Sequence, residues 1–460
     1  MNTASLTSTF LGLRFHTITF GCQMNKHDSE RVGGMLEMLG AYPVESIEEA
    51  DIVVFMTCCV REAADTRLYG QVASMKNIPL REGTPLPKRY IAVGGCIGQR
   101  DGEKLLKSQK HLDVVFGTHN LGSLPLLLAD SINRGGQHVE ILEESSDFPT
   151  ELPTDREHDW AAWLPITIGC NNFCSYCIVP YVRGREKSRL MEAITEEAKG
   201  YVDAGVREIT LLGQNVNSYG RDLYGEPAFA TILEQVAATG IERLRFATSH
   251  PKDLSDEVIA KFGTLDCLQP ALHLPAQSGS NRILKAMNRR YTREHYLSLI
   301  EKIRAVRPDI ALSTDIIVGF PGETEEDFMD TYRLVEEVGY HQVFTFIYSK
   351  REGTPAAEMV DDTPREVIQE RFDRLVELVQ KQAFELNQVD NGTDVEILIE
   401  GASKRNPSLV SGHSPKNQTV HAPIPSGMTA AELCGKICTV HVDEARTWYL
   451  SGTILDGSIR

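Results

Sequence analysis

Three cysteines, Cys170, Cys174 and Cys177, stand in the sequence GCNNFCSYC directly after a predicted strand. Their C-x3-C-x2-C spacing lets three thiolates converge on one metal centre, and thiolates bind both zinc and iron–sulfur clusters. Structural zinc normally takes four ligands in paired spacing, and no further Cys or His pair follows the triplet closely. The triplet therefore predicts an iron–sulfur cluster with one open iron; the alternative is a set of unrelated thiols.

A second set of cysteines follows predicted strands in the first quarter of the chain. Cys22, Cys58 and Cys96 stand in TFGCQMN, MTCCV and VGGC. The carboxyl ends of parallel strands lie at one edge of a sheet, where ligands bind. Three equivalent positions predict a second cluster, again with three protein ligands and an exchangeable site. The alternative is three scattered buried thiols, because free Cys is among the most buried residue types.

The elements that must position the second set lie between residues 13 and 134. Apolar β-branched runs alternate there with amphipathic stretches, and the strand candidates are RFHTITF, DIVVFMT, RYIAVGG and LDVVFGT. Strands that alternate with helical periods indicate a parallel sheet covered by helices. The sequence predicts an α/β domain here.

Three further segments follow this domain. Residues 135–160 are acidic, contain Pro149 and Pro153 and show no helical period, which predicts a solvated linker. Residues 161–388 carry six strand candidates, which predict an incomplete (β/α)6 barrel with its chemistry at the strand ends: LPITIG, REITLLG, RLRFAT, ALHLP, ALSTDIIVGF and QVFTFIYS. Residues 389–460 contain short strands between Gly and Pro turns, which predict a small antiparallel β-barrel.

The composition excludes several classes of protein. A chain of 460 residues with 42% hydrophobic and 24% charged residues is long and apolar enough for about three folded domains, so wholesale disorder is excluded. The net charge of −17 argues against a protein that coats nucleic acid by bulk positive potential, although a local basic site is compatible with it. We see neither a secretory signal nor an apolar run of about 18 residues. We therefore expect a cytoplasmic protein with reduced cysteines and no membrane contact.

The cysteine triplet, at this place in a six-strand barrel, resembles the radical S-adenosylmethionine superfamily. The resemblance implies a [4Fe–4S] cluster on Cys170, Cys174 and Cys177, whose open iron binds S-adenosylmethionine for reductive cleavage to a 5′-deoxyadenosyl radical. It also implies cofactor contacts in LLGQN and DIIVGFPGE, which carry Gly213, Gln214, Asn215, Asp315 and Gly319. Gly319 and Gly322 would allow a close backbone approach to a ligand.

Longer motifs narrow the resemblance. TFGCQMN, GCNNFCSYCIVPYVRGREKSR, LLGQNVNSYG, SHP, LHLPAQSGSNRIL, DIIVGFPGETEEDF and GTPAA are together similar to the tRNA 2-methylthioadenosine synthases, which belong to the methylthiotransferase family of radical S-adenosylmethionine enzymes. The similarity implies an N-terminal domain with an auxiliary [4Fe–4S] cluster on Cys22, Cys58 and Cys96, and a C-terminal TRAM domain that binds tRNA. The implied reaction adds a 2-methylthio group to N6-isopentenyladenosine at tRNA position 37, next to the anticodon. It also implies an electron donor such as flavodoxin or ferredoxin, and we expect a monomer.

One motif departs from the family pattern. The second cysteine motif usually reads Asn-Thr-Cys followed by a small residue, whereas this chain reads Met56-Thr57-Cys58-Cys59. Cys58 matches the family cysteine by position. Because side chains alternate between faces in extended structure, we expect Cys59 to point elsewhere. Met56 in place of Asn is expected to remove a hydrogen bond near the cluster and to change its reduction potential.

Two basic stretches are candidates for contact with tRNA. Cations interleaved with aromatic residues suit a phosphate backbone and an unstacked base, and the first stretch comprises Arg183, Arg185, Lys187 and Arg189, near Tyr176 and Tyr181. The alternative is a solvated charged loop. The second stretch is expected to follow the anticodon stem and comprises Arg282, Lys285, Arg289, Arg290 and Arg293.

Two other functions share these features. A ribosomal-protein aspartate methylthiotransferase would carry both clusters but modify a protein. A non-catalytic iron–sulfur sensor that binds RNA would use the same cysteines without cleaving S-adenosylmethionine. The remaining cysteines, Cys267, Cys434 and Cys438, lack a metal-binding pattern and are predicted to be structural.

Overall fold

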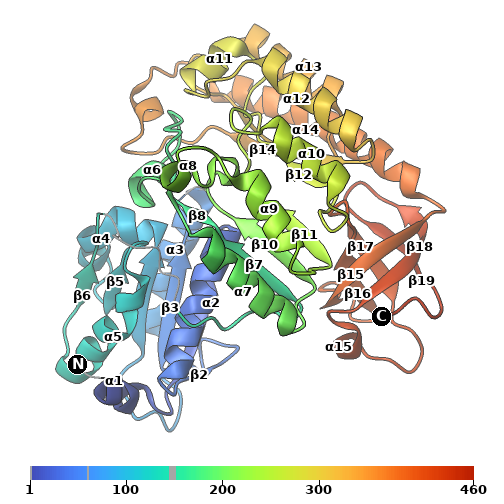
Figure 1. The fold of residues 1–460 in the computed structure, drawn as a ribbon. Helices are drawn as coiled ribbons and strands as arrows, with labels where there is room; N and C mark the ends of the chain where they lie inside the picture. Colours follow the sequence, from blue (N-terminus) through green and yellow to red (C-terminus); the bar gives the residue numbers. More distant parts are fainter. Residues whose placement is uncertain (1–2, 60–61, 144–151) are drawn as a thin grey trace. The chain divides into compact units, whose positions relative to one another are not determined.

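The computed structural model describes residues 3–59, 62–143 and 152–460 (Figure 1). Its internal contacts divide the chain into two compact units. Unit 1 comprises residues 1–158, 167–173 and 177–189, and unit 2 comprises residues 159–166, 174–176 and 190–460. The segment with the cysteine triplet therefore contributes to both units.

Unit 1 contains a six-stranded parallel sheet in the order β2-β1-β3-β4-β5-β6. The strands are β1 (Arg14–Thr19), β2 (Tyr42–Pro43), β3 (Ile52–Thr57), β4 (Tyr90–Gly95), β5 (Val114–Phe116) and β6 (His138–Glu140). The strands β3, β4 and β5 are buried at every position, as expected for parallel strands covered on both faces. The predicted parallel α/β fold is confirmed.

Helices cover both faces of this sheet. They are α1 (Thr3–Phe10), α2 (Gln23–Met38), α3 (Glu62–Ser74), α4 (Cys96–Ser108), α5 (Leu124–Arg134) and α6 (Val179–Val182), with the 3-10 turns η1 (Met75–Asn77) and η2 (Leu121–Ser123). Along β3, Val54 packs in one hydrophobic cluster with Leu36 of α2, and Val53 packs in another with Leu68 of α3. The short strands β8 (Thr167–Ile168) and β9 (Lys187–Ser188) pair with each other in unit 1.

The linker prediction is partly wrong. His138–Glu140 forms the edge strand β6, which pairs in parallel with β5, because its apolar Val139 packs onto the sheet. Farther along, the backbone N–H of Asp155 donates to the carbonyl oxygen of Glu30 at 2.9 Å, so this part of the linker lies against α2. Pro149 lies outside the described residues.

The first part of unit 2 contains two three-stranded parallel sheets. One has the order β11-β10-β7 and the other β12-β13-β14. The strands are β7 (Ala161–Pro165), β10 (Glu208–Leu212), β11 (Arg243–Phe246), β12 (Ala271–His273), β13 (Ala311–Val318) and β14 (Gln342–Ile347). Five predicted strands coincide with β10–β14, whereas the predicted strand LPITIG overlaps only the end of β7 and extends over β8. A parallel bridge between Leu244 and Leu268 continues the pairing beyond β11.

The larger helices of unit 2 alternate with these strands and share one hydrophobic cluster with them, whereas the short helix Arg221–Tyr224 buries no residue. The helices are α7 (Met191–Asp203), α8 (Arg221–Tyr224), α9 (Phe229–Ala237), α10 (Asp256–Thr264), α11 (Asn281–Ala286), α12 (Arg293–Val306), α13 (Glu325–Val338) and α14 (Arg365–Asn387). Three 3-10 turns, η3 (Val216–Ser218), η4 (Pro355–Glu358) and η5 (Gln388–Asp390), complete this part.

The end of the chain forms a closed five-stranded barrel in the order β15-β16-β17-β19-β18, as predicted. Its elements are β15 (Asp394–Ala402), β16 (Leu409–His413), β17 (Thr419–Pro423), α15 (Ala430–Leu433), β18 (Ile437–Ala445) and β19 (Leu450–Ile454). The strands β17 and β19 pair in parallel, and the other neighbours are antiparallel. Closure leaves no sheet edge open to another chain.

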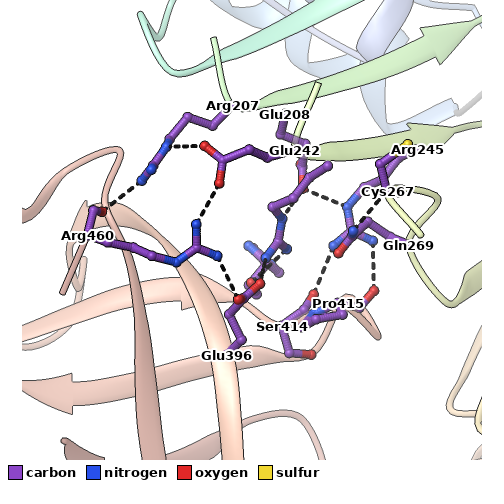
Figure 2. A network of polar contacts seen from close by, with 12 residues as sticks. Arg207, Glu208, Glu242, Arg245, Cys267, Gln269, Glu396, Ser414, Pro415 and Arg460 are labelled. Carbon is purple, nitrogen blue, oxygen red and sulfur yellow. Dashed lines mark hydrogen bonds and ion pairs between the residues drawn. The ribbon is translucent and has the colours of Figure 1, made fainter. Parts of the chain in front are cut away.

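A network of arginines joins this barrel to the α/β part of unit 2 (Figure 2). Arg243 is buried, forms an ion pair with Glu208 at 2.9 Å and donates to the carbonyl oxygen of His413 at 3.1 Å. Arg245 binds the same Glu208 at 2.9 Å and donates to the carbonyl oxygen of Ser414 at 2.8 Å. Arginines of the α/β part therefore fix the barrel by hydrogen bonds to its backbone carbonyl oxygens.

Within the described residues, no helix combines the length and the apolar character needed to cross a membrane.

Candidate metal centres

The auxiliary cysteines of unit 1 follow three neighbouring strands. Cys22 caps the start of α2 shortly after β1, Cys58 follows β3 directly, and Cys96 is the first residue of α4 after β4. Because β3 lies between β1 and β4 and all three are parallel, these cysteines share one edge of the sheet. Cys22 is exposed, whereas Cys58 and Cys96 are buried.

Hydrogen bonds join these thiols in pairs. A bond with Cys58 lowers the pKa of Cys22, and the positive charge of Arg183 acts in the same direction. A bond with Cys59 lowers the pKa of Cys96, again with a contribution from Arg183. Both shifts favour the thiolate, which is the form that ligates metals.

Glycines let the strand ends approach closely enough for this arrangement. A Cβ atom at Gly21 would lie 2.3 Å from Cβ of Cys58, and Gly21 has a φ of +122°. A Cβ atom at Gly95, with a φ of +84°, would lie 2.6 Å from the carbonyl oxygen of Thr57. Only glycine fits both positions without moving the backbone.

The expectation that Cys59 points away from this edge is wrong. Its thiol is buried and hydrogen-bonds to Cys96, and this bond together with burial raises the pKa of Cys59. The strand β3 ends at Thr57, so the alternation of faces in extended structure does not extend to Cys58 and Cys59. Four thiols therefore lie at this edge.

Arg183 lies at the same edge and not on the surface. Its guanidinium donates to Oδ1 of Asn25 at 2.7 Å and to Oδ2 of Asp28 at 2.9 Å, and it hydrogen-bonds to Cys96. The side chain is 7% exposed. The prediction that Arg183 binds tRNA phosphate is therefore wrong: its donors are engaged inside unit 1.

The chemistry of this set fits an iron–sulfur cluster better than a structural role for the thiols. Thiolates favoured by a buried cation are the donors such clusters require. Across the described residues, however, no three His, Cys, Asp or Glu side chains already stand in a metal-binding arrangement. The thiols are instead held as S–H···S pairs, and loss of those protons on binding would free them to act as ligands.

The cysteine triplet is shared by the two units. Cys170 and Cys177 belong to unit 1, and Cys174 belongs to unit 2. In unit 1 the backbone N–H of Cys170 donates to the carbonyl oxygen of Gly184 at 3.1 Å. In unit 2 the thiol of Cys174 is buried, and Nη1 of Arg289 lies 3.5 Å from its sulfur.

Of the three predicted cofactor residues after β10, Asn215 has the most informative surroundings. It is 1% exposed, and its amide nitrogen donates to Oδ2 of Asp253 at 2.7 Å. Its Oδ1 is buried and has no hydrogen-bond partner within residues 3–59, 62–143 and 152–460. Gly213 and Gln214 precede it in the same loop at the carboxyl end of the strand.

Other buried polar atoms without partners lie beside Asn215. They are Nδ2 of Asn217, Oγ of Ser249 and Nε2 of His250. The loops are in contact, because the N–H of His250 donates to Oδ1 of Asn217 at 3.0 Å. Burial lowers the pKa of His250, as does the nearby charge of Arg289, so the ring is neutral. Buried polar atoms normally have hydrogen-bond partners. The unpartnered atoms of these four residues therefore fit the polar end of a bound ligand such as S-adenosylmethionine.

The two predicted cofactor residues at the carboxyl end of β13, Asp315 within the strand and Gly319 directly after it, differ in their surroundings. Asp315 is partly exposed, and Nε2 of His273 lies 3.5 Å from its carboxylate. Gly319 has a φ of +72°, and a Cβ atom there would lie 2.6 Å from Cγ2 of Ile368 on α14. Packing against α14 thus accounts for this glycine, whereas a Cβ atom at Gly322 would meet no atom within 4 Å.

The basic stretches are less available to tRNA than their sequence suggested. Arg189 and Arg289 are buried. Arg282 and Arg293 form ion pairs with acidic residues of α13, Asp327 and Glu337. Arg185 is exposed and lies over the ring of Phe173 at 4.5 Å, so it keeps the cation and aromatic pairing expected of an RNA contact.

The other cysteines lie away from both centres in the sequence and pack locally. Cys267 packs against the main cluster of unit 2, and Cys438 lies in the core of the closed barrel. The sulfur of Cys434 accepts a hydrogen bond from Nε1 of Trp160 at 3.2 Å.

Sequence reasoning missed the polar partners of the cysteines. Asn25 and Asp28 follow Cys22 at spacings of three and six residues on α2, which places them near one helix face. That spacing was the available signal. No local pattern marks the contact between Arg289 and Cys174, because 115 residues separate them.

Comparisons with known proteins agree with this description. The Radical SAM superfamily matches residues 164–335, and the family described as "Uncharacterized protein family UPF0004" matches residues 14–117. In the solved structures, the radical S-adenosylmethionine methyltransferase TsrM from Kitasatospora setae, with cobalamin and a [4Fe-4S] cluster bound, aligns with a TM-score of 0.53 at 11% identity. The alignment covers 75% of this chain and 77% of TsrM, and at this identity it shows the fold alone.

Curated relatives are similar over nearly the whole chain. The tRNA-2-methylthio-N(6)-dimethylallyladenosine synthase of Thermoanaerobacter sp. (strain X514) is 47% identical over 96% of this chain and 93% of its own length. The synthase of the same name from Carboxydothermus hydrogenoformans is 46% identical over 96% of this chain and 99% of its own length. With this identity over nearly the whole length of both chains, the chain belongs to the family of tRNA-2-methylthio-N(6)-dimethylallyladenosine synthases.

Proposed function

We propose that this protein adds a 2-methylthio group to N6-isopentenyladenosine at position 37 of tRNA. The observation that carries the proposal is the 47% identity over 96% of the chain to a synthase of that name. The surroundings of the cysteines support it independently, because one set lies at a single sheet edge beside a buried cation. The proposal covers reaction, substrate and the division of the cysteines between two clusters.

In this proposal Cys22, Cys58 and Cys96 hold the auxiliary [4Fe–4S] cluster. Their position after adjacent parallel strands and the lowered pKa values of Cys22 and Cys96 support the assignment. Arg183 offsets the negative charge of the thiolates, and Asn25 and Asp28 hold its guanidinium in place.

Cys170, Cys174 and Cys177 hold the radical [4Fe–4S] cluster, and S-adenosylmethionine binds beside it. The unpartnered Oδ1 of Asn215 would accept a hydrogen bond from the amino group of the cofactor. The unpartnered polar atoms of Ser249 and His250 would bind further polar groups of the same molecule. When bound, the clusters and S-adenosylmethionine supply the one-electron and sulfur chemistry that side chains lack.

The substrate explains why such chemistry is needed. Carbon 2 of adenine carries an unactivated hydrogen, which neither an acid nor a base removes readily. The base must also leave its stack to reach the reacting groups. Exposed Arg185 on Phe173 is a contact site for the RNA, and the closed barrel at the end of the chain is a second.

The partners follow from this assignment. They are tRNA, S-adenosylmethionine and a low-potential electron donor such as flavodoxin or ferredoxin. We propose that the enzyme works as a monomer in the cytoplasm, where tRNA and reduced thiols are found.

The test is an anaerobic incubation of the reconstituted protein with reductant and methyl-labelled S-adenosylmethionine. Isopentenylated tRNA and ribosomal protein are offered in separate reactions. Label in the tRNA, together with 5′-deoxyadenosine, is the expected result. Label in the protein would favour the ribosomal-protein methylthiotransferase, and a protein with full iron content that forms no 5′-deoxyadenosine would be an iron–sulfur sensor.

A further inference from the structure

Arg289 is a buried cation in direct contact with a cysteine of the triplet. The side chain is 4% exposed, and its Nη1 lies 3.5 Å from Sγ of Cys174, which is also buried. Both residues belong to unit 2. The sequence placed Arg289 in a stretch expected to follow the anticodon stem, and burial removes it from that role.

The guanidinium is held firmly in this position. Its Nη2 donates to the carbonyl oxygen of Pro275 at 2.7 Å, and its Nε donates to the hydroxyl of Tyr291 at 3.1 Å. The Tyr291 hydroxyl in turn donates to the carbonyl oxygen of Ala276 at 2.7 Å. Nε and Nη2 of the guanidinium are thus engaged by these oxygen atoms, and Nη1 is the nitrogen that faces the sulfur of Cys174.

The backbone around Arg289 is built for this contact. The flanking residues Asn288 and Arg290 have φ values of +58° and +56°, in the left-handed region, which asparagine tolerates and which is unfavourable for arginine. The same turn holds the cysteine segment, because the N–H of Ser175 donates to the carbonyl oxygen of Met287 at 3.0 Å. The Ser175 hydroxyl also donates to the carbonyl oxygen of Ala286 at 2.8 Å. Hydrogen bonds thus hold both the Arg289 side chain and the segment that carries Cys174.

Within the part of the chain that the structure describes, the charge of Arg289 has no carboxylate partner. Among the described residues its polar contacts are a backbone carbonyl, a phenol hydroxyl and the sulfur of Cys174. A buried charge without an opposite charge is costly. Cys174 would supply the opposite charge, because it becomes a thiolate when it ligates iron.

We propose that Arg289 is a positioning residue that binds the Cys174 ligand and raises the reduction potential of the radical cluster. An N–H···S bond and a nearby positive charge both stabilise the more negative, reduced state of a thiolate-bound cluster. Reduction of this cluster must precede cleavage of S-adenosylmethionine, so Arg289 makes that step easier. The inference rests on the proposed role of Cys174 as a ligand.

The experiment uses the full chain with Cys22, Cys58 and Cys96 replaced by Ala, so that only the radical cluster forms. Redox titration monitored by electron paramagnetic resonance compares Arg289→Gln, Arg289→Lys and the matched control Arg290→Gln, whose side chain is exposed. We expect a midpoint potential shifted to more negative values in Arg289→Gln, a smaller shift in Arg289→Lys and no shift in Arg290→Gln. If Arg289→Gln does not fold, the electron paramagnetic resonance spectrum and the midpoint potential of Arg289→Lys provide the test.

Equal potentials for all variants at full iron content would overturn the inference and leave the proposed function intact. An equal negative shift in Arg290→Gln would overturn it too, because the effect would then be one of net charge alone. The ligand assignment is tested separately by adding Cys174→Ala to the same background. Retention of the complete cluster signal in that protein would contradict the proposed function itself.

Discussion

Inside unit 1 the buried Arg183 forms an ion pair with the partly buried Asp28, with Nη2 of the arginine 2.9 Å from Oδ2 of the aspartate. The pair joins the segment that follows the cysteine triplet to the helix that follows Cys22. Arg183 also hydrogen-bonds to Cys96. This arginine, which the sequence suggested as an RNA contact, therefore binds the auxiliary cysteines instead.

Arg183→Gln should therefore damage the auxiliary site and leave tRNA binding almost unchanged. Loss of the cation removes a partner of Cys22 and Cys96 and leaves Asp28 without its ion pair. We expect a lower iron content after reconstitution and an unchanged salt dependence of tRNA affinity. Arg185→Gln is the matched control: it should keep the iron and reduce the slope of log affinity against log salt by about 0.9 if it contacts one phosphate. Normal iron content together with a reduced salt slope in Arg183→Gln would contradict this account and indicate that Arg183 contacts the RNA.

Asn215→Ala should weaken binding of S-adenosylmethionine. The buried Oδ1 has no hydrogen-bond partner among the residues that the structure describes, and a ligand hydrogen bond to such a group contributes about 1–3 kcal/mol, or roughly one to two orders of magnitude in affinity. Equilibrium dialysis with the cofactor measures the dissociation constant. Asn281→Ala, at an exposed asparagine of α11, serves as the control and should bind normally. Normal affinity in Asn215→Ala would remove this residue from the cofactor site.

Cys58→Ala and Cys59→Ala separate the two candidate ligands after β3. We expect Cys58→Ala to abolish the auxiliary cluster and methylthiolation while 5′-deoxyadenosine still forms. Cys59→Ala should keep both activities, although it removes the hydrogen bond to Cys96. Iron analysis, product assay and electron paramagnetic resonance of each variant supply the comparison. If Cys59→Ala is inactive in methylthiolation and Cys58→Ala is active, then Cys59 and not Cys58 is the ligand.

Arg243→Ala should release the closed barrel from the α/β part of unit 2. Removal of one partner from a buried ion pair costs about 3–5 kcal/mol, and here it leaves Glu208 with Arg245 alone. Burial raises the pKa of Glu208, but Arg245 and Arg243 outweigh it and hold that pKa below the ordinary value of 4.5. The stabilisation is thus present above about pH 4.5 and disappears as the pH falls through the lowered pKa. Thermal melts should show a gap between wild type and variant that narrows with acid; a constant gap would contradict the role of Glu208.

The sequence was sufficient for the strands and for the positions of the cysteines, because both depend on local patterns. Apolar runs predicted the five strands β10–β14, although the run LPITIG covers only the end of β7 and continues over β8. A sheet edge follows from parallel strands wherever their carboxyl ends carry polar residues. It was insufficient for Arg183 and Arg289, since a basic residue in a polar stretch reads as exposed until its tertiary partners are known. The prediction for Cys59 was wrong for a different reason. It assumed extended backbone through Cys59, but β3 ends two residues earlier, at Thr57, and the sequence carries little signal for where a strand ends.

Analysis of nucleosides by mass spectrometry tests the central claim most directly. The anaerobically reconstituted protein is incubated with S-adenosylmethionine, reductant and tRNA that either carries or lacks the isopentenyl group, and the RNA is then digested. The account predicts a 2-methylthio nucleoside derived from N6-isopentenyladenosine in the isopentenylated sample. Formation of 5′-deoxyadenosine with no methylthio nucleoside in either tRNA would contradict it.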